Sequence, residues 1–240
     1  MSRFDGKRVF VTGAASGIGA ATVELFRKEG ATVVGTDVQK ADGIAFCDVT
    51  DPASVSSAMD SAVKELGGLD IHINVAGVDI FSKFEDLSLD LVRKHIDVNY
   101  IGSFLATHAA LPHLRKSKGN IVTVASISGI QGQPYNAAYC ASKGALVNLA
   151  KQAAIEHAPD AIRVNVVAPS ATDTGLFIQV ASQAPDPDAI IKMVASRNPM
   201  GRLGTAAEVC DAVAFLASDR STYISGTVIP LDGAMAARRS

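Results

Sequence analysis

A glycine-rich turn near the N-terminus places the strongest restriction on the fold of this chain. An apolar strand pattern at residues 8–11 leads into Thr12-Gly13-Ala14-Ala15-Ser16-Gly17-Ile18-Gly19, and a helical pattern continues to about residue 29. Glycines let the backbone turn tightly and approach a pyrophosphate, and the N-terminus of the next helix supplies amide donors. A strand, such a turn and a helix in that order predict a dinucleotide-binding unit. The cofactor contacts expected in the turn are Gly13, Ser16, Gly17, Ile18 and Gly19.

The rest of the chain alternates short β-rich runs with longer helical patterns, which is typical of a parallel sheet with helices on both faces. Further strands are expected near residues 32–36, 44–47, 70–73, 120–124, 163–167 and 226–230. Asp51 and Pro52 are expected to open the helix after the third strand, and Gly67 to end it. Only residues 38–43 separate the second strand from the third, whereas a parallel crossover normally needs about a dozen residues or more. We therefore expect the helix between these strands to be shortened or absent. No linker or repeat divides the chain, so residues 1–240 are expected to form one Rossmann-type, doubly wound α/β domain.

One connection is too long for an ordinary loop. The polar segment 171–200 contains Pro185, Pro187 and Pro199. It is followed by a helix to Ala217 that Thr205 would cap, with Glu208 three residues later as in a capping box. Long connections in compact domains are usually functional. We expect this segment to be a lid or a substrate loop.

Composition and charge exclude several classes of function. The 22 basic and 24 acidic residues give a formal charge of −2, which argues against a nucleic-acid partner. No apolar run is long enough to span a bilayer, and the N-terminus begins a strand at once in place of a signal peptide. The three cysteines are unclustered and the five histidines include no HExxH pair. We therefore expect a cytoplasmic protein without a metal site, whose histidines are surface or packing residues.

Polar and small residues mark the carboxyl ends of the expected strands. They are Gly13, Asp37, Asp48, Asn74, Ser126 and Pro169. Ligands of open α/β sheets bind at this edge, so these residues together indicate one site. Asp37, at the tip of the second strand, suits a bidentate bond to an adenosine ribose and would repel a 2′-phosphate. Because its neighbours Ala15, Ser16 and Val38 include no basic residue, we expect NAD as the cofactor and not NADP.

A tyrosine and a lysine at the start of an apolar helix pattern supply a chemical candidate. Tyr139 and Lys143 are four residues apart, so they share one helical face. An ammonium beside a phenol favours the phenolate, and we expect it to lower the pKa of Tyr139. Such a tyrosine exchanges a proton with an alcohol or a ketone near neutral pH. Taken alone, however, this common spacing favours an amphipathic helix that shows both side chains to solvent.

The combined motifs resemble those of the short-chain dehydrogenase/reductase family, in its form of about this chain's length with a Ser-Tyr-Lys active site. The resemblance covers almost the full chain. Besides the glycine turn, it rests on Asp48-Val49, Asn74-x-Ala76-Gly77, Asn99, Ser126, Tyr139-x-x-x-Lys143, the turn from Pro169 to Thr174, Gly201-Arg202 and Asp232-Gly233.

The resemblance implies a seven-stranded parallel sheet, a homotetramer and a role for each matched residue. Tyr139 would be the general acid/base, Lys143 would lower its pKa and bind the nicotinamide ribose, and Ser126 would bond the substrate oxygen. Asn99 would hold a water molecule that links Lys143 to solvent. The other implied cofactor contacts are Asp48 and Val49 at the adenine, Asn74 and Ala76 along the adenosine, Thr174 near the carboxamide, and Gly77, Pro169, Thr172 and Tyr139.

Three functions are compatible with these motifs to different degrees. The favoured one is an oxidoreductase that transfers a hydride between NAD(H) and a secondary alcohol or its ketone. A 3-oxoacyl-carrier-protein reductase shares every motif but predicts NADPH, which Asp37 disfavours. A NAD-sensing or structural member of the fold predicts loss of Ser126, Tyr139 or Lys143, and all three are present. Because residues 127–138 carry no charged side chain, we expect a neutral, mostly apolar substrate, unless the lid contributes a cation.

Overall fold

One parallel sheet organises the molecule. The computed structural model describes residues 2–182 and 184–237, so the ends of the expected domain (residues 1 and 238–240) and residue 183 of the expected lid lie outside the described residues. Seven described strands pair in parallel in the order β3-β2-β1-β4-β5-β6-β9. They are β1 (Arg8–Thr12), β2 (Thr32–Asp37), β3 (Ile44–Phe46), β4 (Ile71–Asn74), β5 (Asn120–Val124), β6 (Arg163–Pro169) and β9 (Val228–Leu231). The strand order reverses between β1 and β4, the switch point of a doubly wound sheet, so the expected fold is confirmed.

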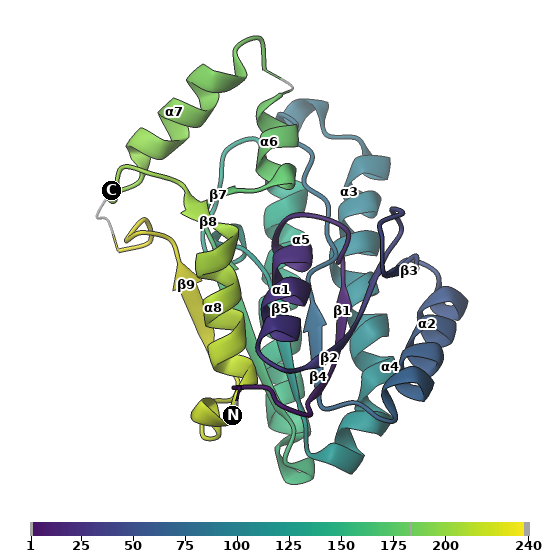
Figure 1. The fold of residues 1–240 in the computed structure, drawn as a ribbon. Coiled ribbons are helices and arrows are strands. Elements are labelled where there is room, and N and C mark those ends of the chain that lie inside the picture. Colours follow the sequence, from purple (N-terminus) through teal and green to yellow (C-terminus); the bar gives the residue numbers. More distant parts are fainter. Residues whose placement is uncertain (1, 183, 238–240) are drawn as a thin grey trace.

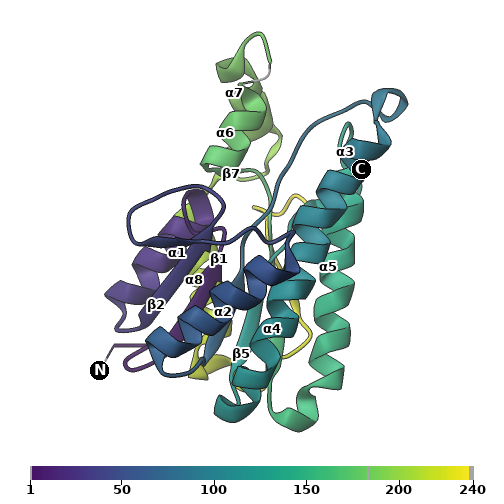
Figure 2. The same ribbon diagram turned by 90° about the vertical axis from the view of Figure 1, so that its right-hand side faces the viewer.

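Helices cover both faces of this sheet (Figure 1, Figure 2). One layer consists of α1 (Gly17–Lys28) and α8 (Ala206–Ala217), which pack against each other. The other layer consists of α2 (Pro52–Leu66), α4 (Gly102–Ser117) and α5 (Ala137–Glu156), and the short α3 (Leu89–His95) precedes α4. None of the described helices is long and apolar enough to cross a bilayer.

Alternate residues of the strands point to opposite faces of the sheet and pack in two hydrophobic cores, one on each face. Val9 and Val11 pack in the core with α1 and α8, whereas Phe10 between them packs in the core with α4 and α5. All five residues of β5 are buried, as expected of a parallel strand that is covered on both faces. Each large apolar side chain buried in this way contributes about 1.5–3 kcal/mol. The two cores therefore fix the carboxyl ends of β1, β4 and β5 at one rigid edge.

Two helices begin and end where the sequence predicts. Asp51 caps α2 by accepting a hydrogen bond from the Ala53 amide at 3.0 Å, and the helix ends at Gly67 with a φ of 72°. At α8, Thr205 and Glu208 form the expected reciprocal capping box. Local side-chain chemistry is sufficient to set these boundaries.

The connection between β2 and β3 contains no helix in residues 38–43, as predicted. The two strands still pair in parallel, with Gly35 opposite Ile44 and Asp37 opposite Phe46. Because no helix covers this corner, the side chains of Val38 and Phe46 are 58% and 67% exposed. The edge of the sheet beside Asp37 is therefore open to solvent.

The expected loop at 171–200 is helical instead. It contains β7 (Thr172–Asp173), α6 (Gly175–Ala181) and α7 (Pro187–Arg197), and β7 pairs with β8 (Gly204–Thr205). Asp186 caps α7 by accepting a hydrogen bond from the Ala189 amide at 3.0 Å, and Pro187 occupies the first turn, where no intrahelical donor is needed. Of the three prolines that suggest a loop, Pro187 is thus part of the start of a helix, and Pro199 follows the end of that helix. Both helices project beyond the carboxyl edge of the sheet (Figure 1).

Candidate active site

The glycine turn packs directly against the end of β4. Gly13 has a φ of 70°, and a Cβ at this position would lie 2.6 Å from the Ala76 Cα. A Cβ at Gly19 would lie 1.9 Å from the Gly13 carbonyl oxygen. Both positions exclude any larger residue, so the turn and the N-terminus of α1 lie as close to the sheet as the backbone allows. This is the geometry that a pyrophosphate-binding turn requires.

Asp37 lies beside this turn, as expected. Its Oδ2 accepts a hydrogen bond from the Ala15 amide at 3.0 Å, and its Oδ1 accepts one from the Gln39 amide at 2.9 Å. Each carboxylate oxygen keeps a second lone pair. The side chain therefore ties the turn to the tip of β2 and still has acceptors for two hydroxyl groups.

Asp48 and Val49, which the family resemblance places at the adenine, follow β3. Asp48 accepts hydrogen bonds from the amide and hydroxyl of Thr50 at 2.9 and 2.7 Å. Val49 is 9% exposed, and a Cβ at Gly102 would lie 2.7 Å from its Cγ2. Val49 thus packs against α4 and leaves little side-chain surface for a ligand.

The Asn74 side chain is hydrogen-bonded within the protein. Its Oδ1 accepts a hydrogen bond from His72 Nε2 at 2.9 Å, and its Nδ2 donates to Thr107 Oγ1 at 3.1 Å. Burial lowers the pKa of His72 to about 4, so the imidazole stays neutral. This side-chain amide therefore joins β4 to α4, because only a fully bonded polar group is stable at such depth. The expected place of Asn74 along the adenosine stays a prediction.

Ser126, Tyr139 and Lys143 meet at the carboxyl end of β5, and all three are buried. Lys143 Nζ lies 5.6 Å from the centroid of the Tyr139 ring and donates a hydrogen bond to the Val124 carbonyl at 3.2 Å. Ser126 Oγ accepts a hydrogen bond from the Ser128 amide at 3.1 Å. The tyrosine–lysine pair thus does not lie on an exposed helical face, and the serine hydroxyl is fixed beside it.

Asn99 lies in a π-helical segment, Ile96–Ile101, between α3 and α4. Its Oδ1 accepts a hydrogen bond from the Val78 amide at 2.7 Å, and its Nδ2 donates to the Val78 carbonyl at 3.0 Å and to Ser142 Oγ at 2.9 Å. A Cβ at Gly77 would lie 3.1 Å from Asn99 Oδ1 and 3.3 Å from Lys143 Nζ. Asn99 and Gly77 are thus part of the same cluster, and π-bulges are frequent at functional sites.

The turn after β6 completes this edge. A Cβ at Gly17 would lie 3.5 Å from the Thr174 Cβ, so Thr174 lies next to the glycine turn. Thr172 is buried and donates a hydrogen bond to the Ser170 carbonyl at 2.9 Å, while the Ser170 amide donates to the Leu231 carbonyl. The Thr172 hydroxyl thus stabilises the turn itself, and Thr174 is the threonine that faces α1.

The pKa values of the tyrosine and the lysine shift in opposite directions. Burial raises the pKa of Tyr139, the Asp79 carboxylate raises it further, and hydrogen bonding with Ser126 lowers it. Burial lowers the pKa of Lys143 to about 8, against the opposing effect of Asp79. The expectation that Lys143 lowers the pKa of Tyr139 is therefore wrong for this structure. Desolvation favours the neutral form of both groups and is the largest cause of both shifts.

The chain is similar in sequence to known proteins. A family model described as Enoyl-(Acyl carrier protein) reductase matches residues 13–235. The chain is 36% identical to the L-fucose dehydrogenase of Bos taurus over 244 residues, which cover 97% of this chain and 90% of that protein. The chain belongs to the short-chain dehydrogenase/reductase family.

Other relatives in this family act on different substrates. A meso-2,3-butanediol dehydrogenase of Serratia marcescens is 37% identical, with 96% of this chain and 95% of that protein covered. A 3-oxoacyl-[acyl-carrier-protein] reductase of Thermotoga maritima is 36% identical, with 97% and 99% covered. The solved structure of Thermoplasma acidophilum aldohexose dehydrogenase superposes with a TM-score of 0.93 at 34% identity and covers 99% of this chain and 97% of that chain. Membership of the short-chain dehydrogenase/reductase family establishes an oxidoreductase that acts on CH–OH groups.

Two residues of this short-chain dehydrogenase/reductase site were not predicted. His95 is fully buried, its Nδ1 donates to the Leu91 carbonyl at 2.8 Å, and its Nε2 accepts a hydrogen bond from the Ile80 amide at 3.1 Å. Its ring packs edge-on against Tyr139, with centroids 6.3 Å apart. Asp79 adds a carboxylate to a site in which residues 127–138 supply none, so the site is more polar than expected. No spacing in the sequence relates these two residues to Tyr139.

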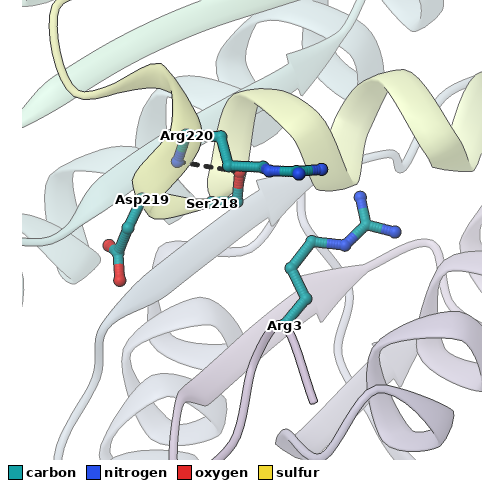
Figure 3. Close-up of a pocket in the computed structure, with 4 residues that line it drawn as sticks. All are labelled: Arg3, Ser218, Asp219 and Arg220. Carbon is teal, nitrogen blue, oxygen red and sulfur yellow. Dashed lines mark hydrogen bonds between the residues drawn. The ribbon is translucent and has the colours of Figure 1, made fainter. Parts of the chain in front are cut away.

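A separate hollow lies at the opposite, amino-terminal edge of the sheet (Figure 3). It has a volume of about 430 Å³ and is lined by Arg3, Ser218, Asp219 and Arg220. Arg3 pairs with Glu29 and Asp219 pairs with Lys7, so these charges have partners within the protein. We assign this hollow no function. The described residues also contain no group of three or more His, Cys, Asp or Glu side chains that would hold a metal ion.

Proposed function

We propose that this enzyme transfers a hydride between NAD(H) and a neutral secondary alcohol or its ketone, with Tyr139 as the general acid/base. The observation that carries the proposal is the buried cluster of Ser126, Tyr139 and Lys143, which Gly77 and Ala76 connect to the glycine turn. Relatives named as dehydrogenases of secondary alcohols support the reaction type.

The described residues fit a dinucleotide. The glycine turn presents the N-terminus of α1, and Asp37 keeps free lone pairs for ribose hydroxyls. Its carboxylate and the absence of a basic residue at positions 15, 16 and 38 support NAD over NADP. Bound NAD would supply the hydride acceptor, and the protein would supply position and electrostatics.

The chain's own residues would handle the proton. Tyr139 would take the hydroxyl proton of an alcohol or give its proton to a ketone oxygen, and Ser126 would donate a hydrogen bond to that oxygen. Because its pKa is raised, Tyr139 is protonated at neutral pH, which is the form that ketone reduction needs. Lys143, with a pKa of about 8, would exchange protons with solvent through water held at Asn99.

Three further assignments belong to the same proposal. We infer that α6 and α7, within residues 171–200, form a lid over the carboxyl edge. We infer a homotetramer, which is supported by apolar side chains on the outer faces of two long helices: Phe104 on α4 is 42% exposed and Ile155 on α5 is 78% exposed. We also infer a cytoplasmic location, in keeping with three cysteines that are all free thiols.

The test measures turnover of a panel of secondary alcohols with NAD and with NADP, followed by the absorbance of the reduced cofactor. We expect kcat/KM to be higher with NAD by roughly tenfold or more, because like charges juxtaposed at Asp37 cost several kcal/mol. Equal use of both cofactors would refute the assignment of NAD. Failure to oxidise any alcohol or reduce any ketone would refute the reaction.

The Thermotoga maritima relative favours a second candidate, the reduction of a 3-oxoacyl group carried by acyl carrier protein. This candidate predicts NADPH as the reductant. Acetoacetyl thioester offered with NADPH and with NADH distinguishes the two functions, since only the second candidate predicts that NADPH and the thioester form the best pair.

A further inference from the structure

Asp79 is held in place on both sides by side chains of the site. The amide and the carbonyl of Val78 are both bonded to Asn99, at 2.7 and 3.0 Å. The amide of Ile80 donates to His95 Nε2 at 3.1 Å. Both of these partners are fully buried. The backbone on either side of Asp79 is therefore fixed, which limits the directions that its side chain can take.

The Asp79 carboxylate contacts the N-terminal end of the catalytic helix. Its Oδ2 accepts a hydrogen bond from Asn136 Nδ2 at 3.4 Å, and Asn136 immediately precedes α5. Asn136 and Tyr139 are three residues apart, which places neighbouring side chains of a helix about 5–6 Å apart at their Cβ atoms. The electrostatic effect of Asp79 on both Tyr139 and Lys143 agrees with this proximity.

Two oxygen atoms of this pair have no donor among the residues that the structure describes. In the described part of the chain, four buried side-chain oxygens or nitrogens lack a hydrogen-bond partner, and two of them are Asp79 Oδ1 and Asn136 Oδ1. The other two, in Glu29 and Asn120, lie away from the carboxyl edge. Buried acceptors without a donor are costly and rare, so a pair of them beside a reacting tyrosine calls for a donor from outside the protein.

We propose that Asp79 and Asn136 bind a second hydroxyl group of the substrate, one or two carbons from the carbon that is oxidised. This inference rests on the proposed function and names its substrate class as a diol or polyol. A hydroxyl donates to one of the two free oxygens and needs no charge of its own. An ammonium would bring a second cation next to Lys143, and a carboxylate would face Asp79 directly. A neutral polyol satisfies the acceptors without either repulsion.

The experiment compares vicinal diols with the matching mono-alcohols, namely 1,2-cyclohexanediol with cyclohexanol and 2,3-butanediol with 2-butanol. For the natural enzyme we expect a higher kcat/KM for the diol of each pair. Asp79→Leu should lower the ratio of the two kcat/KM values by roughly 10- to 100-fold, the range for a hydrogen bond to a charged group. Any change in the protonation of Tyr139 affects both substrates equally and cancels in this ratio.

Asp79→Asn nearly keeps the volume of the side chain, so it is the second variant if Asp79→Leu does not fold. It should also lower the ratio of kcat/KM for the diol to that for the mono-alcohol, but to a smaller extent. Asp86→Asn, an exposed change in the same connection, is the matched control and should leave the ratio unchanged. A ratio that stays constant in both Asp79 variants would overturn the inference, as would a preference for 2-aminocyclohexanol over the diol.

The outcomes separate this inference from the proposed function. Equal turnover of diol and mono-alcohol by the natural enzyme would overturn the inference and leave the proposed function standing. Turnover of neither class with NAD would overturn both. NADH binding, followed by its fluorescence, should be the same in Asp79→Leu as in the natural enzyme.

Discussion

Replacing Tyr139 with phenylalanine removes one oxygen atom and little else. The ring is 8% exposed, packs edge-on against His95 and lies 5.6 Å from Lys143 Nζ, and all of these contacts remain in Tyr139→Phe. Loss of a general acid/base typically costs about 10²–10⁴-fold in rate, or about 3–5 kcal/mol in activation free energy. We therefore expect kcat to fall by this factor while the fold is retained.

The assay should separate chemistry from cofactor binding. Oxidation of a good alcohol is followed by NADH absorbance, and NADH affinity is measured by its fluorescence. We expect an unchanged NADH affinity, because the Tyr139 hydroxyl lies at the substrate and not in the glycine turn. Tyr223→Phe makes the same chemical change at a fully exposed position near the other edge of the sheet and should be neutral. Turnover of Tyr139→Phe close to that of Tyr223→Phe would refute the role of the hydroxyl.

Other changes test other parts of the structure. Asp37→Ala should lower kcat/KM with NAD and narrow its advantage over NADP, because two backbone hydrogen bonds and one negative charge are lost; steady-state kinetics with both cofactors measures this. Gly19→Ala should lower the free energy of unfolding by about 1–3 kcal/mol in urea, since its Cβ would meet the Gly13 carbonyl. Asp79→Asn should lower the pKa of Tyr139, which the carboxylate raises, so the rise of alcohol oxidation with pH should move to lower pH. Sedimentation of the natural enzyme should show a tetramer, and a monomer at micromolar concentration would reject that proposal.

The fold was largely predictable because its signals are local. The glycine turn, the caps at Asp51 and Thr205 and the short connection at residues 38–43 each act over a few residues, and each is found where the sequence predicts it. The prolines of segment 171–200 suggest a loop, but proline favours both turns and the first turn of a helix. Only the observed cap at Asp186 separates the two.

The site was predictable only in part, because some of its residues meet through the topology of the sheet. Tyr139 and Lys143 are one helical turn apart, so their spacing indicates a pair. Asp79 lies in the connection after β4, and His95 is the last residue of α3. The packing of α3 against α5 brings His95 to Tyr139, and Asp79 meets the start of α5 through Asn136. The pKa of Tyr139 was mispredicted for the same reason, since the prediction included the lysine but neither the depth of burial nor Asp79.

The asparagines of the site show what distinguishes a structural residue from one that binds substrate. Asn74 and Asn99 are buried, and the oxygen and the nitrogen of each side-chain amide are hydrogen-bonded within the protein. Asn74 is bonded to His72 and Thr107, and Asn99 is bonded to the Val78 backbone. Asn136 is as deeply buried, but its oxygen has no donor among the described residues. Burial and residue type are therefore alike in all three, and only the state of their hydrogen bonds differs. A saturated amide stabilises the backbone around it, whereas an unsaturated one gains stability when a ligand donates to it. By this criterion Asn74 and Asn99 set the geometry of the site, and Asn136 with Asp79 selects what binds there.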